Sequence, residues 1–248
     1  MKIVVCVSSV PDTTSKINFT DNNSNFDTNG VQFVINPYDE FGLTKAMILK
    51  ESLGGTITII TVGDETVEPV MRKALAIGAD NAVRINMNAT DSYSTASEIV
   101  NYLKDKPADL IIAGRESIDY NGGAVPGIIA ELMNLPFINA CIGLTVTGTS
   151  AKLNREIDGG QEAISAELPL IIGGQKGLVH ESELRIPNMR GIMQARSKPL
   201  EIIETSVNQK LTASVSFDKP EEKGDCRLVD ANNVAELVSL LHNESKVI

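Results

Sequence analysis

The sequence predicts an α/β fold in which a parallel β-sheet carries helices on both faces. Three observations lead to this prediction: short apolar runs rich in β-branched residues, stretches with apolar residues at helical spacing between them, and glycines where the runs stop. Strand and helix signals alternate over residues 1–140. This order is typical of consecutive β-α-β units, whose helices cover both faces of a parallel sheet.

The individual elements follow from the local period of the apolar residues. The expected strands are residues 3–7 (IVVCV), 56–62 (TITIITV), 82–85, 109–113 (DLIIA) and 169–172. The expected helices are residues 39–53, 65–77, 92–103 and 128–133. The first three of these helices place their apolar residues on one stripe. Gly78 is expected to end the second helix, because glycine is the usual residue just past a helix C-terminus.

The pattern changes after residue 140. Residues 142–168 alternate and contain the turn sequences TGTS and DGG, so antiparallel strands are expected there. The stretch REIDGG, residues 155–160, reads as a hairpin turn with solvated charges. Residues 188–196 predict a short helix, residues 197–225 mixed β and coil, and residues 230–242 a last helix. We expect an α/β domain over residues 1–200 and a C-terminal arm over residues 201–248. Packing of the arm on a partner and a small C-terminal subdomain are alternatives.

Composition excludes several classes of protein. The net charge of −10 leaves no basic excess to neutralise phosphates, so no nucleic-acid binding is expected. The apolar run at the N-terminus is too short for a signal peptide or a membrane span, which predicts a cytoplasmic protein that is not membrane-embedded. Three separated cysteines and two histidines build neither a disulfide framework nor a metal site. Cys6 and Cys141 are expected to be buried thiols.

The loop GRESIDYNGGAVPG, residues 114–127, is the most informative stretch. In a parallel sheet ligands bind beyond the carboxyl ends of the strands, here the loops after Val7, Val62 and Ala113. Gly122 and Gly123 would let the backbone approach a ligand, and the helix that follows would favour an anion such as phosphate. The loop matches neither the GxGxxG fingerprint nor the P-loop, so a structural turn is the alternative.

A second stretch, INPYDE at residues 35–40, places Asn36 and Pro37 just before a helix. A turn with a helix N-cap is the alternative to a binding role. Asp39 and Glu40 are expected to offset the helix dipole rather than to act as general acid and base. The sequence contains no Ser-His-Asp constellation and no activated cysteine motif, so we expect no catalytic residues.

Six segments together resemble the beta subunit of electron-transfer flavoproteins, including FixA-like proteins. They are VVCVSSVPDT, NPYDEF, RKALAIGAD, DLIIAGRESIDYNGG, REIDGG and IPNMRGIMQARSKPL, in register between residues 4 and 200. The resemblance implies a Rossmann-like, adenine-nucleotide-binding domain in a heterodimer with an alpha subunit that holds most of a redox FAD. It also implies a structural AMP, or a second FAD in electron-bifurcating members.

The implied function is electron transport rather than enzymatic turnover. The bound FAD would carry electrons from acyl-CoA dehydrogenases or similar donors, as in fatty acid oxidation, to a quinone-linked oxidoreductase. A stand-alone adenine-nucleotide-binding regulatory protein is an alternative from another class, because it would use the same loops without a partner. Behaviour of the chain expressed alone separates the two.

The resemblance also assigns residues by position. The implied cofactor-binding residues are Cys6, Thr13, Asn36, Pro37, Tyr38, Asp39, Val62, Gly114, Ser117, Asp119, Asn121, Gly122, Gly123, Ala124 and Val125. Thr13 and Tyr38 match positions near the flavin, Glu156 matches an acid that pairs with the alpha subunit, and Met189 matches the apolar anchor that docks dehydrogenases. The family often reads Asp-Gly-Asp-Thr at residues 119–122, and Gly123, Ala124 and Val125 replace its polar phosphate cradle. Phosphate contacts are therefore expected from backbone amides.

Overall fold

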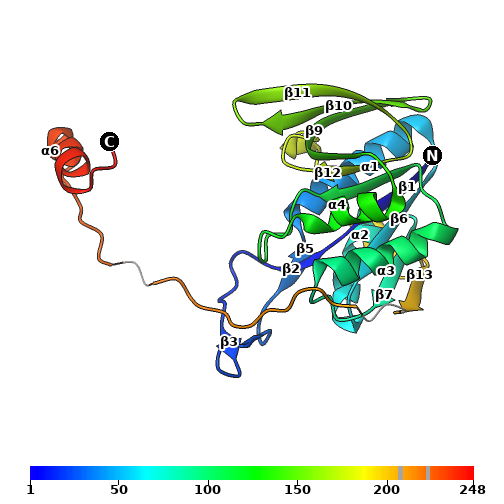
Figure 1. Ribbon diagram of the computed structural model, residues 1–248, viewed down its shortest axis with the longest axis horizontal. Coiled ribbons are helices and arrows are strands. Elements are labelled where there is room, and N and C mark those ends of the chain that lie inside the picture. The colour runs from blue at the N-terminus through cyan, green and yellow to red at the C-terminus, as the bar shows by residue number, and fades with distance from the viewer. Residues whose placement is uncertain (206–208, 222–223) are drawn as a thin grey trace.

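One mixed sheet organises the protein. In the computed structural model, which describes residues 1–205, 209–221 and 224–248, nine strands pair in the order β11-β10-β9-β12-β8-β1-β6-β7-β13 (Figure 1). Each neighbouring pair from β9 to β13 in this order is parallel, and β10 is antiparallel to both β9 and β11. The α/β fold with a parallel sheet and a small antiparallel section is confirmed.

The central strands are the apolar runs that the sequence indicates. They are β1 (Lys2–Cys6), β6 (Thr56–Val62), β7 (Asn81–Asn86), β8 (Leu110–Gly114) and β12 (Leu170–Gly174). All residues of β8 and β12 are buried, as expected for parallel strands covered on both faces. The outermost parallel strand, β13 (Leu200–Glu204), pairs with β7 and lies in the stretch expected as mixed β and coil.

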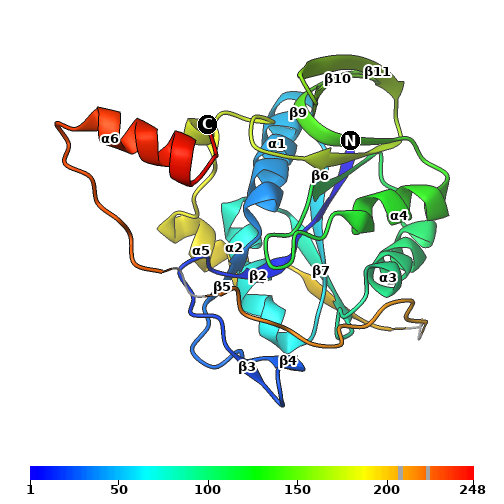
Figure 2. The same cartoon turned by 60° about the vertical axis from the view of Figure 1, so that its left-hand side comes forward.

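Helices cover both faces of the sheet (Figure 2). One face carries α1 (Pro37–Leu53), α2 (Glu68–Ile77, after the 3₁₀ turn Glu65–Val67) and α5 (Met189–Ala195). The other carries α3 (Ser92–Asp105) and α4 (Ala124–Met133). Each face has its own apolar core, built on one side around Val5, Leu43 and Met71 and on the other around Val4, Ile60 and Ile99. Successive side chains of β1 point to opposite faces of the sheet, so they belong alternately to one core and to the other.

The antiparallel section is a three-stranded extension of the sheet. It consists of β9 (Phe137–Thr147), β10 (Ser150–Ile157) and β11 (Gly160–Glu167). The predicted hairpin at REIDGG is confirmed, and Gly159 takes the left-handed conformation there (φ 82°). Arg155 pairs with Glu162 across the hairpin at 2.6 Å on the exposed surface.

Two small sheets were not expected from the sequence. Strand β2 (Ser9–Pro11) pairs with β5 (Phe33–Ile35), and β3 (Phe19–Thr20) pairs with β4 (Asn25–Phe26). The remaining elements are a 3₁₀ turn (Glu181–Glu183), helix α6 (Val234–Ser239) and a π-helical turn (Leu240–Glu244). Helix α6 stands away from the body at the end of an extended segment (Figure 1).

Several predicted boundaries are wrong by a few residues. Helix α4 begins at Ala124 rather than at residue 128, because Pro126 fits the first turn of a helix, where its missing N–H costs no hydrogen bond. The expected helix over residues 230–242 is α-helical only over Val234–Ser239. Helix α1 begins at Pro37, two residues before the expected start.

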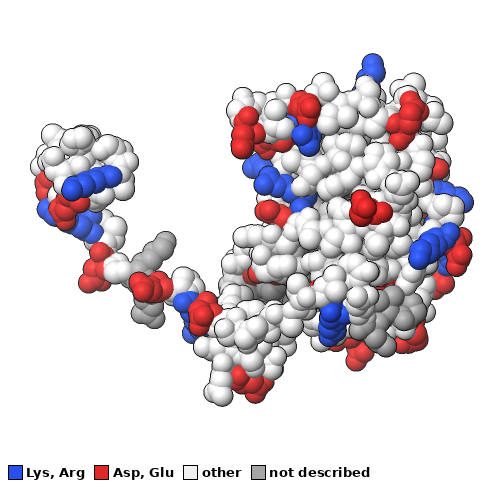
Figure 3. All heavy atoms as spheres, viewed as in Figure 1, with Lys and Arg blue, Asp and Glu red and all other residues white. Residues whose placement is uncertain are grey.

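The surface carries acidic and basic side chains at scattered places. Figure 3 shows them mainly around the rim of the body, with a largely uncharged middle on the face in view. Within the described residues, no helix combines the length and the apolar character needed to cross a membrane.

Helices α5 and α2 are held together by cationic side chains, each of which binds carbonyl groups at the C-terminus of the other helix. Arg72 on α2 donates to the carbonyl oxygens of Ala195 and Lys198, at 2.7 and 2.9 Å. Lys198 in turn donates to the carbonyl oxygens of Leu75 and Ala79 at the end of α2, at 2.8 and 2.6 Å. Carbonyl groups at both helix C-termini therefore bond to cations of the opposite segment.

A glycine sets the distance between these two helices. A Cβ at Gly191 would overlap the carbonyl oxygen of Ala76, which is backbone and has no rotamer to change. We predict that Gly191→Ala lowers the free energy of unfolding by about 1–3 kcal/mol, the usual range for overpacking. Urea denaturation measures this, with Gly127→Ala as control, because a Cβ there would meet the Phe137 ring at an ordinary 3.6 Å. Equal losses in the two variants would contradict the prediction.

Candidate functional site

The candidate site lies where the strand order reverses. Strand β1 lies between β8 and β6, so successive connections leave it in opposite directions across the sheet. The loops after β1 and β8 therefore separate at the carboxyl edge, which is the usual ligand-binding position in open α/β sheets. The loops expected to form the site, after Val7, Val62 and Ala113, all lie at this edge.

A buried carboxylate joins the two loops at this point. Asp39, on the first turn of α1, is 3% exposed. Its Oδ2 accepts a hydrogen bond from the backbone N–H of Ser8 at 2.7 Å, and its Oδ1 accepts one from the N–H of Gly114 at 2.8 Å. Asp39 lies in the first turn of α1, where the sequence placed it, and its carboxylate also connects the end of β1 to the end of β8. Glu40 instead pairs with Lys73 at 3.0 Å.

Asn36 makes the second connection. It is the N-cap residue of α1, but its side chain does not cap the helix. Its amide nitrogen donates to the carbonyl oxygen of Glu116 at 2.9 Å, and its Oδ1 accepts from the N–H of Ile118 at 3.3 Å. The residue is 1% exposed, so these bonds satisfy a buried amide. Asn36 and Asp39 thus fix the first half of the loop after β8.

Burial changes the acidity of the groups in this interior. Desolvation raises the pKa of Asp39 to about 7, against the hydrogen bonds from Ser8, Asn36 and Gly114, which lower it. Burial also raises the pKa of the neighbouring Cys6 thiol to about 12, with a contribution from Asp39. Cys6 and Cys141 are both buried, as expected, and Cys6 is a neutral thiol rather than a nucleophile.

The loop after β8 is a compact turn with an open tip. The N–H of Ser117 donates to the carbonyl oxygen of Gly122 at 2.9 Å, which closes its neck, and Asn121 takes a left-handed conformation (φ 56°). A Cβ at Gly122 would overlap the far end of the exposed Tyr120 ring, so this ring would have to move to make room. Asp119, Asn121 and Gly123 are exposed at the tip. At the base, a Cβ on Gly114 would overlap Asp39 Oδ1.

The loop ends at the N-terminus of helix α4. Gly123 is the N-cap, and no side chain within the described residues caps this helix. Ala124 is exposed and Val125 half-buried, so their backbone amides lie at a surface. Pro126 has no N–H to contribute. An uncapped helix N-terminus with small residues is the local arrangement that binds an anion.

The third side of the site is the end of β6. Val62 is its last residue and is half-buried. The Thr61 hydroxyl donates to the carbonyl oxygen of Val7 at 2.9 Å, which ties β6 to the end of β1. Buried Arg84 on β7 donates to the carbonyl oxygen of Gly63 at 3.1 Å and pairs with Glu68 at 3.1 Å. Arg84 was not expected at the site, although a lone arginine inside an apolar strand is a recognisable signal of a buried ion pair.

A chain of side chains extends the site towards β10. The Arg115 guanidinium donates to Gln175 Oε1 at 2.9 Å, and the Gln175 amide donates to the Glu156 carboxylate. Gln175 is buried and follows β12, in the glycine-rich stretch after that strand. Glu156 is exposed at the end of β10, so its carboxylate is held at the surface by a buried amide. Arg115 lies in the loop that the sequence indicated, but neither its contact with Gln175 nor a role for Gln175 was expected.

Two implied residues lie outside this cluster. Thr13 is exposed in the loop after β2, on the chain that leaves the carboxyl end of β1. Met189 is 75% exposed at the start of α5, and Asn188 caps that helix by accepting from the N–H of Gly191 at 2.8 Å. The alternative that Met189 packs into the core of its own domain does not hold in this structure. Tyr38 is half-buried next to Pro37 in the first turn of α1.

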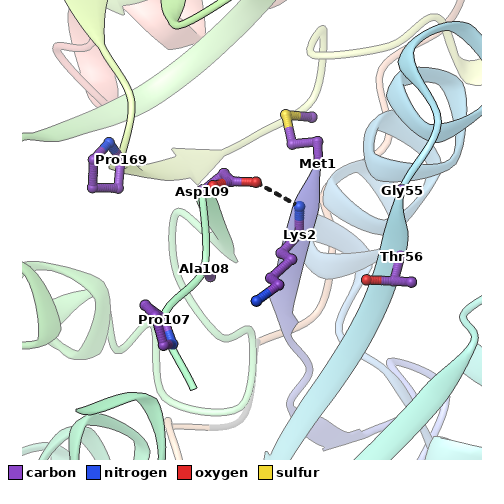
Figure 4. A pocket seen from close by; sticks show the side chains of 8 residues that line it. All are labelled: Met1, Lys2, Gly55, Thr56, Pro107, Ala108, Asp109 and Pro169. Carbon is purple, nitrogen blue, oxygen red and sulfur yellow. Dashed lines mark hydrogen bonds between the residues drawn. The ribbon is translucent and has the colours of Figure 1, made fainter. Parts of the chain in front are cut away.

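A hollow of about 600 Å³ lies at the opposite, amino edge of the sheet (Figure 4). It is lined by Met1, Lys2, Gly55, Thr56, Pro107, Ala108, Asp109 and Pro169. The hydrogen bond drawn in this hollow joins the Lys2 backbone N–H to Asp109 Oδ2 at 2.7 Å, so these two polar groups are already paired with each other. We assign the site to the carboxyl edge, because polar groups converge there and strand topology favours it. Among the described residues, no cluster of His, Cys, Asp or Glu is placed to hold a metal ion.

Comparison with known proteins agrees with this architecture. Residues 24–208 match the family described as Electron transfer flavoprotein domain. The chain is 40% identical to an electron transfer flavoprotein subunit beta of Bacillus subtilis (strain 168), over 88% of this chain and 90% of the relative. It is 31% identical to the corresponding subunit of Syntrophomonas wolfei, over 90% and 87% of the two chains. It is 29% identical to protein FixA of Azotobacter vinelandii, over 82% and 74%.

The fold and its open carboxyl edge define an α/β protein of the Rossmann-like class. Within this class, the chain belongs to the family of electron transfer flavoprotein beta subunits and FixA-like proteins, because the family match covers most of its length. An electron-transfer flavoprotein role follows from this membership.

The buried Asp39 predicts a pH dependence of stability. Its pKa is raised from 3.8 in the unfolded chain to about 7 in the folded protein, so folding takes up a proton between these values and stability falls as the pH rises. We predict that Asp39→Asn removes a decrease of about 2 kcal/mol in the free energy of unfolding between about pH 5.5 and 8. Urea denaturation of both proteins across this range measures the difference.

Glu40→Gln provides the matched control, because it removes the adjacent carboxylate and keeps Asp39. This variant is expected to retain the pH slope of the wild type. If wild type and Asp39→Asn show the same slope, the carboxylate is not the titrating group.

Proposed function

We propose that this chain is the beta subunit of a heterodimeric electron-transfer flavoprotein and that it binds AMP as a structural nucleotide. In this proposal an alpha subunit holds most of a redox FAD, which takes electrons from acyl-CoA dehydrogenases or similar donors and passes them to a quinone-linked oxidoreductase. The single observation that carries the nucleotide assignment is the uncapped N-terminus of α4 beside the loops joined by Asp39.

The residues present fit an adenine nucleotide. The amides of Gly123, Ala124 and Val125 would receive the phosphate, since an uncapped helix start binds anions and these side chains leave room. The ends of β1 and β6, at Cys6 and Val62, would form the apolar walls for a base or ribose. Asn36 and Asp39 are engaged with backbone groups, so their contribution would be to shape the crevice through the peptide backbone of residues 36–39.

The chemistry of the complex would come from the flavin. A bound FAD supplies one- and two-electron redox chemistry, and the protein contributes its orientation and surroundings. The Arg115–Gln175–Glu156 chain supports the proposed contact between Glu156 and a cation of the alpha subunit, because it holds the carboxylate in one orientation before assembly. Thr13 and Tyr38 are exposed and half-buried, respectively, which is compatible with a flavin that approaches from the partner.

The segment around α5 supports a docking role. Ile186, Met189 and Met193 are 83, 75 and 69% exposed, while the helix beneath them is locked to α2. Exposed methionines on a rigid base make an adaptable apolar contact that suits several partners. The C-terminal arm, with helix α6 standing free of the body, supports the proposed packing on the alpha subunit.

Counting nucleotides tests the proposal. The chain is co-expressed with its alpha subunit, the complex is denatured, and the released small molecules are quantified. One FAD and one AMP per heterodimer are expected. Two FAD and no AMP would replace the AMP by a second flavin, as in the electron-bifurcating alternative. Stable nucleotide binding by the chain alone, without association with an alpha subunit, would instead indicate a regulatory protein.

Gly123 tests the phosphate site. A Cβ at this position would lie 3.0 Å from the carbonyl oxygen of Arg115, and the branches of a valine would crowd the start of α4. The conformation itself is ordinary (φ −120°), so crowding rather than backbone strain is the expected cause. We predict that Gly123→Val weakens AMP binding about tenfold or more, or about 1.4 kcal/mol. Calorimetry measures the affinity, and Gly127→Ala, one turn later in α4, is the control. Full AMP occupancy in Gly123→Val would show that the loop is wrongly assigned.

Met189 tests the docking segment. We predict that Met189→Ala leaves folding and flavin content unchanged and slows electron transfer from the dehydrogenase, by about 1–2 kcal/mol in the transfer step. Steady-state kinetics with varied flavoprotein concentration measure this loss. Leu53→Ala, which removes another exposed apolar side chain at the far end of α1, is the control. A lower melting temperature with unchanged kinetics would assign Met189 to structure rather than to docking.

A further inference from the structure

The C-terminal arm is attached to the body before it reaches helix α6. Its residues in the described ranges 209–221 and 224–248 run from the sheet edge at β13, along α3 and past the β3–β4 hairpin (Figures 1 and 2). Two attachment points are formed by different chemistry. One is a pair of hydrogen bonds to Asp91, and the other is an aromatic stack on Phe19.

The first attachment point uses the helix cap of α3. Asp91 Oδ1 accepts from the N–H of Ser94 at 2.8 Å, as an N-cap does. Its Oδ2 accepts from both the N–H and the hydroxyl of Thr212, at 2.9 and 2.6 Å. The Thr212 hydroxyl and the Ser94 amide hold the pKa of Asp91 at about 2, so the carboxylate is ionised and both bonds are charge-assisted.

The second attachment point is the β3–β4 hairpin, both on its strands and in its turn. The Phe217 ring stacks on Phe19 with centroids 5.0 Å apart and planes 8° apart, and Phe19 also contacts Phe26 edge-on. The N–H of Phe217 donates to the carbonyl oxygen of Asn23 at 2.8 Å. Lys219 donates to Asn18 Oδ1 at 2.9 Å. A backbone bond of Phe217 and a side-chain bond of Lys219 therefore accompany the stacked ring.

The turn of the β3–β4 hairpin has an uncommon backbone conformation. It contains Asp21, Asn22 and Asn23 in succession with left-handed backbone, at φ 50, 57 and 64°. Such conformations are unfavourable outside glycine, although asparagine and aspartate tolerate them best. The turn brings the Asn23 carbonyl to Phe217, and an isolated two-stranded hairpin is only marginally stable by itself. The arm and the hairpin thus depend on each other.

We propose that the β3–β4 hairpin is a clip for the C-terminal arm, in which Phe19 and Phe217 fix the arm and thereby hold helix α6 in position for the alpha subunit. The assignment of the occupant rests on the proposed function. Helix α6 exposes Val234, Leu237 and Val238 at helical spacing, so it offers an apolar face to that partner. A clipped arm loses less conformational freedom on binding than a free one, and affinity increases accordingly.

A single exposed thiol allows the clip to be tested without the partner. Cys226 is exposed between Phe217 and α6, whereas Cys6 and Cys141 are buried. A thiol-reactive fluorophore on Cys226 therefore reports the mobility of the arm in the full chain. We expect lower anisotropy in Phe217→Ala and in Phe19→Ala, with no further decrease in the double variant. Phe217→Tyr, which retains a ring for stacking, should keep the anisotropy of the wild type.

The second measurement is the affinity for the alpha subunit. Phe217→Ala is expected to raise the dissociation constant about tenfold or more, with circular dichroism and the melting temperature of the body unchanged, and Phe217→Tyr is expected to restore it. A chain that ends at residue 225 should lose at least as much affinity. Unchanged label anisotropy in Phe217→Ala would overturn the clip, and lower anisotropy with unchanged affinity would overturn its role in positioning α6. If the wild type does not bind the alpha subunit, the proposed function fails, and the anisotropy alone still decides whether the clip exists.

Discussion

The site depends on one buried carboxylate at the point where the strand order reverses. Asp39 connects the N–H groups that follow β1 and end β8, the two strands between which an open α/β sheet leaves a crevice. Burial of such a charge is costly by several kcal/mol, and each bond to a charged acceptor returns about 1.5–3 kcal/mol. With both backbone donors in place the group is tolerated, at a pKa near neutrality. The geometry of the crevice is therefore coupled to the protonation of one side chain.

The layout of the sheet could be predicted because burial on both faces leaves a continuous apolar run. TITIITV and DLIIA are short, rich in apolar residues and end at a glycine, which is typical of buried parallel strands, and most of their side chains are buried here. β13 was not identified as a strand, because LEIIE is short and flanked by charge, and its register comes from β7 alone. The start of α4 was also missed, since glycines and a proline at residues 122–126 indicate a loop unless the helix that follows is known.

The candidate site was predictable by segment but not by side-chain role. The sequence indicated the loop at residues 114–127 and the stretch at residues 35–40, which lie together at the carboxyl edge. It did not indicate that Asn36 bonds Glu116 or that Arg115 orients Gln175, because these partners are far apart in sequence and only the topology brings them together. Asp39 in a first helical turn has a sufficient local explanation in the helix dipole. Its burial and its bonds to Ser8 and Gly114, which no local pattern reveals, give it a second role.

The two surfaces proposed for partners differ in how the chain restrains them. Segment α5 is held by cations that cap helix ends reciprocally, with Gly191 allowing close backbone contact, so its exposed methionines stand on a rigid base. Helix α6 is held at a distance, through Thr212 and Phe217, and its own apolar face contributes nothing to the core of the body. A rigid helix with flexible exposed side chains suits brief encounters with several donors, because the backbone does not change conformation at each contact. A clipped arm suits a lasting interface, because most of its ordering is complete before the partner arrives. Under the proposed function, α5 serves transient electron-transfer contacts, whereas the clipped arm serves permanent subunit assembly. The chain restrains these two segments in different ways.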